Sequence, residues 1–238
     1  MPDSKVAWVT GGSAGIGLAI AKALADSGHL TVISARSEDA LRSAQSEIEA
    51  AGGRCEYIVN DVTDRAAVNA AAKSIVDRHG QVDVLVNNAG FNSQKREWDD
   101  LVPEEFDAVL SVNVTGTFNA IHALLPAMRE RKGGLIVNIS SGAGKMVGVG
   151  AGVAYTIAKH GVHIMSRLLN QSELKHGIRT CVITPAFVST RAHDWRPQEM
   201  RQYMLQPEEV ARVVRFAIDS PPNSAIFEIE LSWAPPLP

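Results

Sequence analysis

The segment from Lys5 to Gly28 places the strongest constraint on the fold. Lys5 to Thr10 is a short, mostly apolar run without alternating polar residues, which is typical of a strand covered on both faces. The glycine turn Gly11-Gly12-Ser13-Ala14-Gly15-Ile16-Gly17 follows, and then a helix rich in Ala, Leu and Ile. This order suits a phosphate cradle, because glycines let the backbone approach a pyrophosphate at a helix N-terminus. The spacing is Gly-x-x-x-Gly-x-Gly rather than Gly-x-Gly-x-x-Gly, and a turn that only reverses the chain is the alternative.

Strands and helices alternate along the rest of the chain. Regular alternation predicts βαβ units and a parallel sheet. Right-handed crossovers then place the loops that follow the strands at one edge, where open α/β sheets bind ligands. We therefore expect an α/β, single-domain Rossmann fold over residues 1–238, with a seven-stranded, mostly parallel, doubly wound sheet and helices on both faces. The further strands are predicted at 30–35, 54–59, 82–86, 135–139, 178–184 and, as an edge strand, 226–231, with a short substrate-loop insertion at 191–206.

Composition excludes several functional classes. Hydrophobic residues make up 45% of the 238 residues and charged residues 21%, which is an ordinary balance for a globular protein with a core. The net charge is −3 and no basic block is present, so we expect neither a nucleic-acid nor a membrane partner. Cys55 and Cys181 stand in apolar runs, which suggests buried thiols in a reducing compartment.

Targeting signals and metal-ligand patterns are not predicted either. The histidines show no metal-ligand spacing, so no metal is expected. The N-terminal residues lead directly into a predicted strand, so we expect no signal peptide, and no apolar run is expected to approach the length of a membrane span. We expect a cytoplasmic protein.

The end of the second predicted strand bears on the choice of cofactor. Arg36 follows the run Leu30 to Ala35. In a dinucleotide fold an acid at this position bonds the 2′-hydroxyl of NAD, whereas an arginine suits the 2′-phosphate of NADP. Glu38 and Asp39 open the next helix, where the helix dipole favours acidic residues. The sequence thus favours NADP over NAD, with a surface arginine of no special role as the alternative.

Tyr155 and Lys159 stand one helical turn apart in a helix predicted over residues 153–176. At i and i+4 both side chains emerge on one face of the helix. A free tyrosine has a pKa of about 10, and a cation within roughly 4–6 Å lowers it. The pair could therefore supply a general acid/base near neutral pH. The same spacing is common on ordinary helices, so the prediction needs support from other segments.

Two other positions could complete such a site. Asn113 lies among apolar residues in a helix predicted from Pro103 to about Arg131, which Pro126 is expected to kink or end late. A buried amide needs partners, and a satisfied core asparagine is the alternative. Ser140-Ser141 stands at the end of a predicted strand and precedes a glycine-rich segment, residues 142–152.

Taken together, these residues resemble the short-chain dehydrogenase/reductase family across essentially the whole chain. Thr10 to Gly17 is similar to the cofactor turn of that family, and Asn87-Asn88-Ala89-Gly90 to its sheet-stabilising motif. The resemblance implies a catalytic tetrad of Asn113, Ser141, Tyr155 and Lys159. It also implies cofactor contacts from Gly11, Ser13, Ala14, Gly15, Ile16, Gly17, Arg36, Asp61, Val62, Asn88, Ala89, Gly90, Tyr155, Lys159, Pro185, Val188 and Thr190.

The chain departs from the family pattern at two points. The interval from Ser141 to Tyr155 is one residue longer than expected, which leaves Ser140 as a second candidate for the catalytic serine. Pro185-Ala186 stands where the family usually has Pro-Gly, and alanine costs this turn some backbone freedom.

The resemblance implies hydride transfer between NADP(H) and a carbonyl or secondary alcohol. In it Tyr155 acts as general acid/base, Ser141 bonds the substrate oxygen, Lys159 lowers the pKa of Tyr155 and binds the nicotinamide ribose, and Asn113 holds a water. The alternatives are an NAD-dependent alcohol dehydrogenase and a non-catalytic dinucleotide-sensing protein. The mostly apolar candidates for the substrate pocket, which favour an aliphatic, alicyclic or aromatic ketone or alcohol, are Ser93, Val149, Phe187, His193 and Trp195.

The family also commonly pairs the two long helices that carry Asn113 and Tyr155 between subunits. A homodimer or homotetramer is therefore expected. Leu124 and Leu168 are predicted to be exposed apolar positions that fit such pairing.

Overall fold

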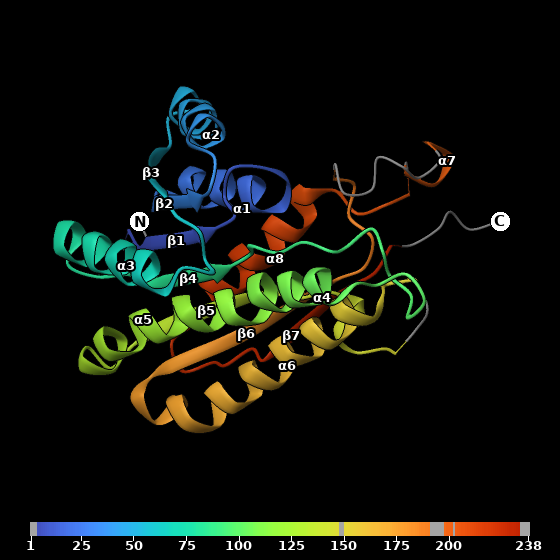
Figure 1. The fold of residues 1–238 in the computed structure, drawn as a ribbon. Coiled ribbons are helices and arrows are strands. Elements are labelled where there is room, and N and C mark those ends of the chain that lie inside the picture. The colour runs from blue at the N-terminus through green and yellow to red at the C-terminus, as the bar shows by residue number, and fades with distance from the viewer. Residues whose placement is uncertain (1–3, 148–149, 191–197, 202, 234–238) are drawn as a thin grey trace.

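Seven strands form one sheet in the order β3-β2-β1-β4-β5-β6-β7, and every neighbouring pair is parallel (Figure 1). The computed structural model describes residues 4–147, 150–190, 198–201 and 203–233. The strands are β1 (Val6–Thr10), β2 (Leu30–Ala35), β3 (Arg54–Val59), β4 (Val84–Asn87), β5 (Gly134–Ile139), β6 (Ile178–Pro185) and β7 (Glu228–Leu231).

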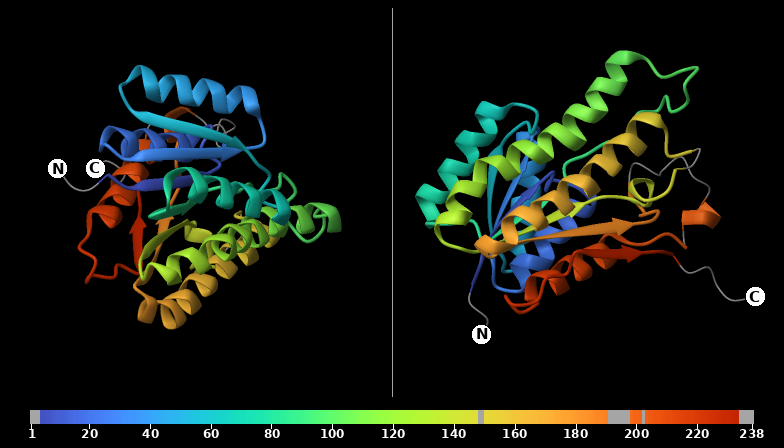
Figure 2. Two further views of the ribbon diagram at one scale, coloured as in Figure 1. Left: turned by 90° about the vertical axis from the view of Figure 1, so that its left-hand side faces the viewer. Right: turned by 90° about the horizontal axis from the view of Figure 1, so that it is seen from below.

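Helices cover both faces of this sheet (Figure 2). Helices α1 and α8 pack on one face, and α3, α5 and α6 on the other, which confirms the doubly wound Rossmann architecture. The helices are α1 (Gly15–Asp26), α2 (Glu38–Ala50), α3 (Arg65–His79), α4 (Pro103–Leu110), α5 (Thr117–Glu130), α6 (Val153–Glu173), α7 (Gln198–Arg201) and α8 (Pro207–Asp219), with a π-helical turn η1 (Ser111–Gly116) and 3-10 turns η2 (Gly142–Gly144) and η3 (Leu174–His176).

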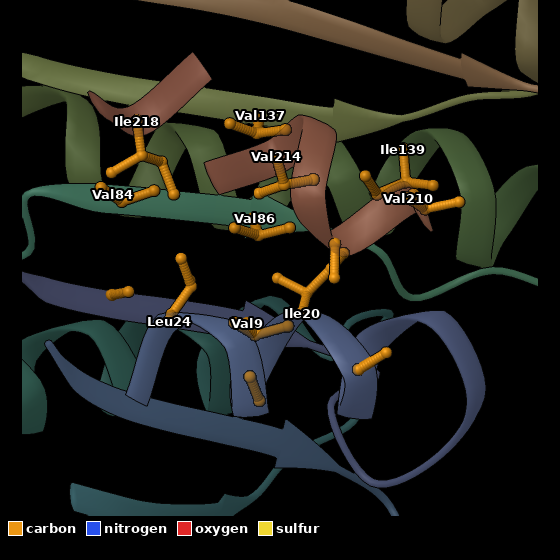
Figure 3. Close-up of a cluster of buried hydrophobic side chains, with 14 of the residues drawn as sticks. Val9, Ile20, Leu24, Val84, Val86, Val137, Ile139, Val210, Val214 and Ile218 are labelled. Carbon is orange, nitrogen blue, oxygen red and sulfur yellow. The ribbon is translucent and has the colours of Figure 1, made fainter. Parts of the chain in front are cut away.

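The larger core lies between the sheet and the pair α1 and α8 (Figure 3). Ile20 and Leu24 of α1 and Val214 of α8 are fully buried there, against side chains such as Val86 of β4. These strands are apolar on both faces because helices cover both, and this is why their sequences lack polar alternation. The chain order reverses between β1 and β4, so a crevice opens beyond their carboxyl ends.

An ion pair links the two long helices on the other face. Glu173 of α6 accepts hydrogen bonds from Nε and Nη2 of Arg129 on α5, at 2.7 and 2.6 Å. The Arg129 hydrogen bonds hold the pKa of Glu173 at about 2, against the opposing effect of burial. The bidentate geometry fixes the spacing of α5, which continues from the turn that carries Asn113, and α6, which carries Tyr155 and Lys159.

The predicted helix over 103–131 differs from expectation in its middle and at its end. It contains the π-helical turn η1 around Asn113, and Pro126 lies inside α5 without ending it. Leu124 and Met128, on either side of Pro126, are each 1% exposed, so their packing holds the last turns in helical form. The prediction that Leu124 is exposed was therefore wrong, whereas Leu168 is 58% exposed as expected.

The prediction that no apolar run approaches a membrane span was also wrong by length and composition. The helical segment Pro103–Glu130 has 28 residues and a mean hydropathy of 1.3 in its most apolar window, 44% of which is buried inside the protein. Core helices of soluble proteins meet the same criterion, and the buried side chains of Ile121, Leu124 and Met128 contribute here to the core.

The expected burial of Cys55 and Cys181 is confirmed, and both thiols are free.

Stability is expected to fall as the pH drops from about 7 to about 5, because two histidines are buried. His29 is 1% exposed, and its Nε2 has no hydrogen-bond partner in the described part of the chain. Burial, and after it the charge of Lys5, lowers the pKa of His29, and burial likewise lowers the pKa of His163. The unfolded chain therefore takes up protons that the folded protein does not, so stability present above about pH 6.5 is lost below it.

Urea unfolding at the two ends of this pH interval tests the prediction. His29→Gln removes one of the buried titrating groups, so its free energy of unfolding should depend less on pH than that of the wild type. His122→Gln, at an exposed position on α5, is the matched control. An unchanged pH slope in His29→Gln would contradict the role given to His29.

Candidate active site

Hydrogen bonds join the glycine turn after β1 to the segment that follows β4. The side-chain amide of Asn88 donates to the backbone oxygens of Thr10 and Gly11, both at 3.1 Å. A Cβ on Gly17 would lie 2.2 Å from the Gly11 oxygen and 2.5 Å from Nδ2 of Asn88. Gly11 has φ +65°, in the left-handed region that favours glycine. These positions require glycine, and the turn thus leaves its amide groups free of side chains.

Thr10 joins the Asn-Asn-Ala-Gly segment to β1. Its hydroxyl accepts the backbone N–H groups of Asn88 and Ala89, at 3.1 and 3.2 Å. One residue earlier, the Asn87 amide donates to Oδ1 of Asn138 on β5 at 2.8 Å. The predicted sheet-stabilising motif therefore ties together the ends of the three central strands.

A cavity of about 330 Å³ lies beside this turn. Arg36, exposed at the end of β2, stands on one wall and Asp61 on another. Burial raises the pKa of Asp61, but hydrogen bonds from Thr63 and the charge of Arg36 outweigh it, so the net shift is downward. The predicted cofactor residues that line the cavity are Gly11, Ser13, Arg36, Asp61, Val62, Ala89 and Gly90. A glycine cradle beside a pocket with an arginine at its rim fits a dinucleotide with a phosphorylated ribose.

The other predicted cofactor positions lie around the mouth of the turn or at the end of β6. Ala14 is the N-cap of α1, and Ile16 is partly buried in its first turn. The Thr190 side chain comes within 3.6 Å of the Cβ position of Gly15, which has φ +54°. Pro185 is the last residue of β6, and Val188 is 3% exposed and paired with Leu205.

The structure separates the two candidate serines. The Ser141 hydroxyl acts on the Tyr155 phenol and opposes the rise of its pKa, and it also caps η2 by accepting the Ala143 N–H at 3.3 Å. Ser140 is 3% exposed, and its hydroxyl lies 2.8 Å from the Cβ position of Gly144, on the side of His163. The geometry thus places Ser141, and not Ser140, beside the phenol.

Lys159 lies under Tyr155, but it does not act as expected on the pKa of the phenol. Its Nζ donates to the Ile139 oxygen at 3.0 Å and stands 5.4 Å from the centre of the Tyr155 ring. Burial raises the pKa of Tyr155, and the opposing influences are the Ser141 hydrogen bond and the charge of Arg96. Burial also lowers the pKa of Lys159 to about 8. The expected lowering of the Tyr155 pKa by Lys159 was therefore wrong for this structure, because desolvation of the phenol dominates.

Asn113 completes the group from the π-helical turn. Its Nδ2 donates to the Phe91 and Val109 oxygens at 2.8 and 2.9 Å, while Oδ1 is buried without a partner in the described part of the chain. The Cβ position of Gly90 lies 2.6 Å from this Oδ1 and 3.5 Å from Nζ of Lys159. Gly90 thus allows Asn113 and Lys159 to approach each other, and all four tetrad residues border one site.

The predicted substrate-pocket residues are placed less completely. Phe187 is 43% exposed after β6. Ser93 is 5% exposed and donates its hydroxyl to Glu105 of α4, so this hydroxyl is engaged within the protein. Val149, His193 and Trp195 lie outside the described residues. Among those that are described, no group of three His, Cys, Asp or Glu side chains could hold a metal ion.

Sequence comparison decides the family. Residues 5–200 match the family described as short chain dehydrogenase. The chain belongs to the short-chain dehydrogenase/reductase family, whose members are oxidoreductases that use a nicotinamide dinucleotide. A relative from Streptomyces virginiae, named as a ketoacyl reductase of monensin polyketide synthase, is 40% identical over 189 residues, which cover 79% of this chain and 72% of the relative.

Solved structures of this family share the fold over almost the whole chain. A metagenomic short-chain oxidoreductase in complex with NADP is 34% identical, with a TM-score of 0.85 and 98% of each chain covered. A variant of actinorhodin polyketide ketoreductase with NADPH is 32% identical, with a TM-score of 0.89 over 98% of this chain and 97% of that one. The likeness supports the single-domain fold and makes a dinucleotide in the crevice the expectation for this protein.

Proposed function

We propose that this protein transfers a hydride between NADP(H) and a carbonyl or secondary alcohol substrate, with Tyr155 as general acid/base. The observation that carries the proposal is the Lys159 ammonium 5.4 Å from the centre of the Tyr155 ring, with the Ser141 hydroxyl acting on the same phenol. The proposal rests as well on the glycine cradle, which is held by Asn88 next to this group.

Each residue has a separate task in carbonyl reduction. NADP(H), when bound, supplies the hydride in reduction and accepts it in oxidation. Ser141 would donate a hydrogen bond to the carbonyl oxygen as negative charge grows there. Tyr155, whose pKa is raised by burial, stays protonated at neutral pH and would donate its proton to the same oxygen.

Lys159 and Asn113 have separate roles beside the phenol in the proposed reaction. With a pKa of about 8, Lys159 keeps most of its positive charge at neutral pH, and its ammonium would bind the nicotinamide ribose. The buried Oδ1 of Asn113 has no partner in the described part of the chain and could accept from a water. That water would give the site a route for protons.

Arg36→Ala is expected to weaken NADPH binding about 10-fold to 100-fold, because it removes a charge-assisted hydrogen bond to the 2′-phosphate. Affinity for NADH, which lacks that phosphate, should change by less than about threefold. Fluorescence titration of the reduced cofactors measures both. Arg42→Ala, at an exposed arginine paired with Glu38 on α2, is the matched control. Wild-type protein that binds NADH more tightly than NADPH would instead support the NAD-dependent alternative.

The relatives suggest a class of substrates to try first. Two of the proteins compared above carry names of ketoacyl or polyketide ketoreductases, so 3-oxoacyl thioesters join the aliphatic, alicyclic and aromatic ketones as candidates. A panel of these carbonyls and their alcohols, followed by nicotinamide absorbance, tests the proposed reaction. Turnover of at least one member supports it. Tight NADPH binding without turnover of any member would favour the dinucleotide-sensing alternative.

The setting of the enzyme is part of the proposal. We place it in the cytoplasm, as a homodimer or homotetramer that acts on small molecules. Exposed apolar side chains on the two long helices, Phe118, Ile157, Ile164 and Leu168, support pairing of these helices between subunits. Size-exclusion chromatography with light scattering tests the assembly.

A further inference from the structure

Two loops that border the site are bound to each other. The entrance loop, residues 91–102, connects β4 to α4, and residues 150–152 lead into α6. The side-chain amide of Asn92 donates to the Ala151 oxygen at 2.7 Å. Nη1 of Arg96 donates to the Gly150 oxygen at 2.8 Å, and the Arg96 backbone oxygen accepts the Val153 N–H at 2.9 Å. Arg96 therefore contacts the chain on both sides of Gly152, just before the turn of helix that carries Tyr155.

Packing fixes Arg96 in this place. A Cβ on Gly152 would lie 3.0 Å from Cβ and 3.1 Å from Cγ of Arg96, and Gly152 has φ +90°. Only glycine meets both conditions without strain, so the stem of Arg96 lies directly over this residue. Nε of Arg96 also donates to the Ser93 oxygen at 3.3 Å, and the Ser93 hydroxyl is bound to Glu105 of α4. The entrance loop is thus anchored to two helices.

We propose that Arg96 is a positioning residue for Tyr155, acting through the turn that begins α6 and through its own positive charge. This role rests on the proposed function of Tyr155. The charge that acts on the phenol comes from Arg96 of the entrance loop, whereas Lys159 of α6 stands 5.4 Å from the centre of the Tyr155 ring. Lys159 is buried and its ammonium donates to the Ile139 oxygen. Arg96 belongs to the entrance loop, and its guanidinium donates to the Gly150 oxygen. The charge of Arg96 thus acts on the phenol from an element separate from α6.

The electrostatic effect of Arg96 has a definite sign. Burial raises the pKa of Tyr155, and the Ser141 hydrogen bond and the Arg96 charge oppose that rise. Without Arg96 the phenol would be harder to ionise. Alcohol oxidation needs the phenolate as base, so loss of Arg96 should slow oxidation at moderate pH. Reduction, which needs the protonated phenol, should be affected less at neutral pH.

Direct titration of the phenol tests the proposal without substrate. The chain has three tyrosines, so protein labelled with carbon-13 at tyrosine Cζ gives three resonances, and Tyr155→Phe identifies that of Tyr155. In Arg96→Met the titration midpoint of Tyr155 should move to higher pH, while Arg96→Lys, which keeps the charge, should stay close to the wild type. Lys95→Met is the matched control, because it removes a neighbouring cation that pairs with Glu105.

Kinetics then measure the consequence. At a pH below the midpoint, kcat/KM for alcohol oxidation in Arg96→Met should fall about tenfold for each unit by which the midpoint rises. Arg96→Gln serves if Arg96→Met does not fold, as judged by circular dichroism. An unmoved Tyr155 midpoint in the neutral variant, or an equal shift in Lys95→Met, would overturn the inference. A shifted midpoint in a protein without turnover would leave the inference standing and would refute the proposed function instead.

Discussion

Tyr155→Phe is expected to lower kcat/KM for carbonyl reduction by about 10³-fold, within the range that general acid–base catalysis contributes. The substitution removes one oxygen and keeps the aromatic ring that lies 5.4 Å from the Lys159 ammonium. The proton donor to the nascent alkoxide is then missing, and so is the hydroxyl on which Ser141 acts. Initial rates followed by nicotinamide absorbance measure the loss, and NADPH titration should show affinity within about threefold of the wild type.

The control for Tyr155→Phe removes a hydroxyl elsewhere. The Tyr57 hydroxyl donates to Glu38 at 3.2 Å, an exposed contact outside the tetrad. Tyr57→Phe should therefore keep its turnover. If Tyr155→Phe turned over substrate at the wild-type rate, the proton would have to come from another group. The role of Tyr155 as general acid/base, on which the roles of Ser141 and Lys159 depend, would then be refuted.

The sheet was predictable because its strands are buried on both faces. The apolar runs of β1, β2 and β5 lack polar alternation, and the glycine-rich segments that follow β1 and β5 have few alternatives to a loop. The glycine spacing after β1 follows from contacts that the structure makes explicit: a Cβ on Gly17 would meet the Gly11 oxygen. Local sequence therefore contained the information for the cradle.

The parts that were not predicted depend on distant contacts. The π-helical turn around Asn113 is held by a hydrogen bond from the Asn113 side-chain amide to the backbone oxygen of Phe91, which lies 22 residues away in the chain. A helical pattern carries no sign of that contact, although π-helical turns often mark functional sites. The prediction for Leu124 was wrong because an apolar residue on a helix can face either a partner subunit or the core. In the structure the face of α5 that carries Leu124 packs against α3.

The choice between Ser140 and Ser141 also needed the backbone. Counting residues to Tyr155 could not decide it, but the chain is extended at Ser141, with φ −165°, so neighbouring side chains point in different directions. Arg96 gave no sequence signal beyond its place in a polar loop. Its partner Gly150 is 54 residues away in the chain, and only the fold brings them together.

Gly17→Ala is expected to weaken NADPH binding by at least about 100-fold and to destabilise the protein by about 1–3 kcal/mol, the usual cost of overpacking. The added methyl would lie 2.2 Å from the Gly11 oxygen, so the turn must open. Opening breaks the hydrogen bonds from Asn88 to Thr10 and Gly11 and moves the amides that would face a pyrophosphate.

Thermal unfolding and NADPH titration measure the two effects of Gly17→Ala together. Each kcal/mol lost should lower Tm by about 2–4 °C for a chain of this size. Gly133→Ala is the control, since a Cβ there would meet nothing within 4 Å. A Gly17→Ala protein with wild-type Tm and wild-type NADPH affinity would mean that the turn gives way without cost, and the cradle could then not be the feature that holds the dinucleotide. A protein that loses only NADPH affinity would show that the turn relaxes locally, which still requires the dinucleotide to lie against Gly17.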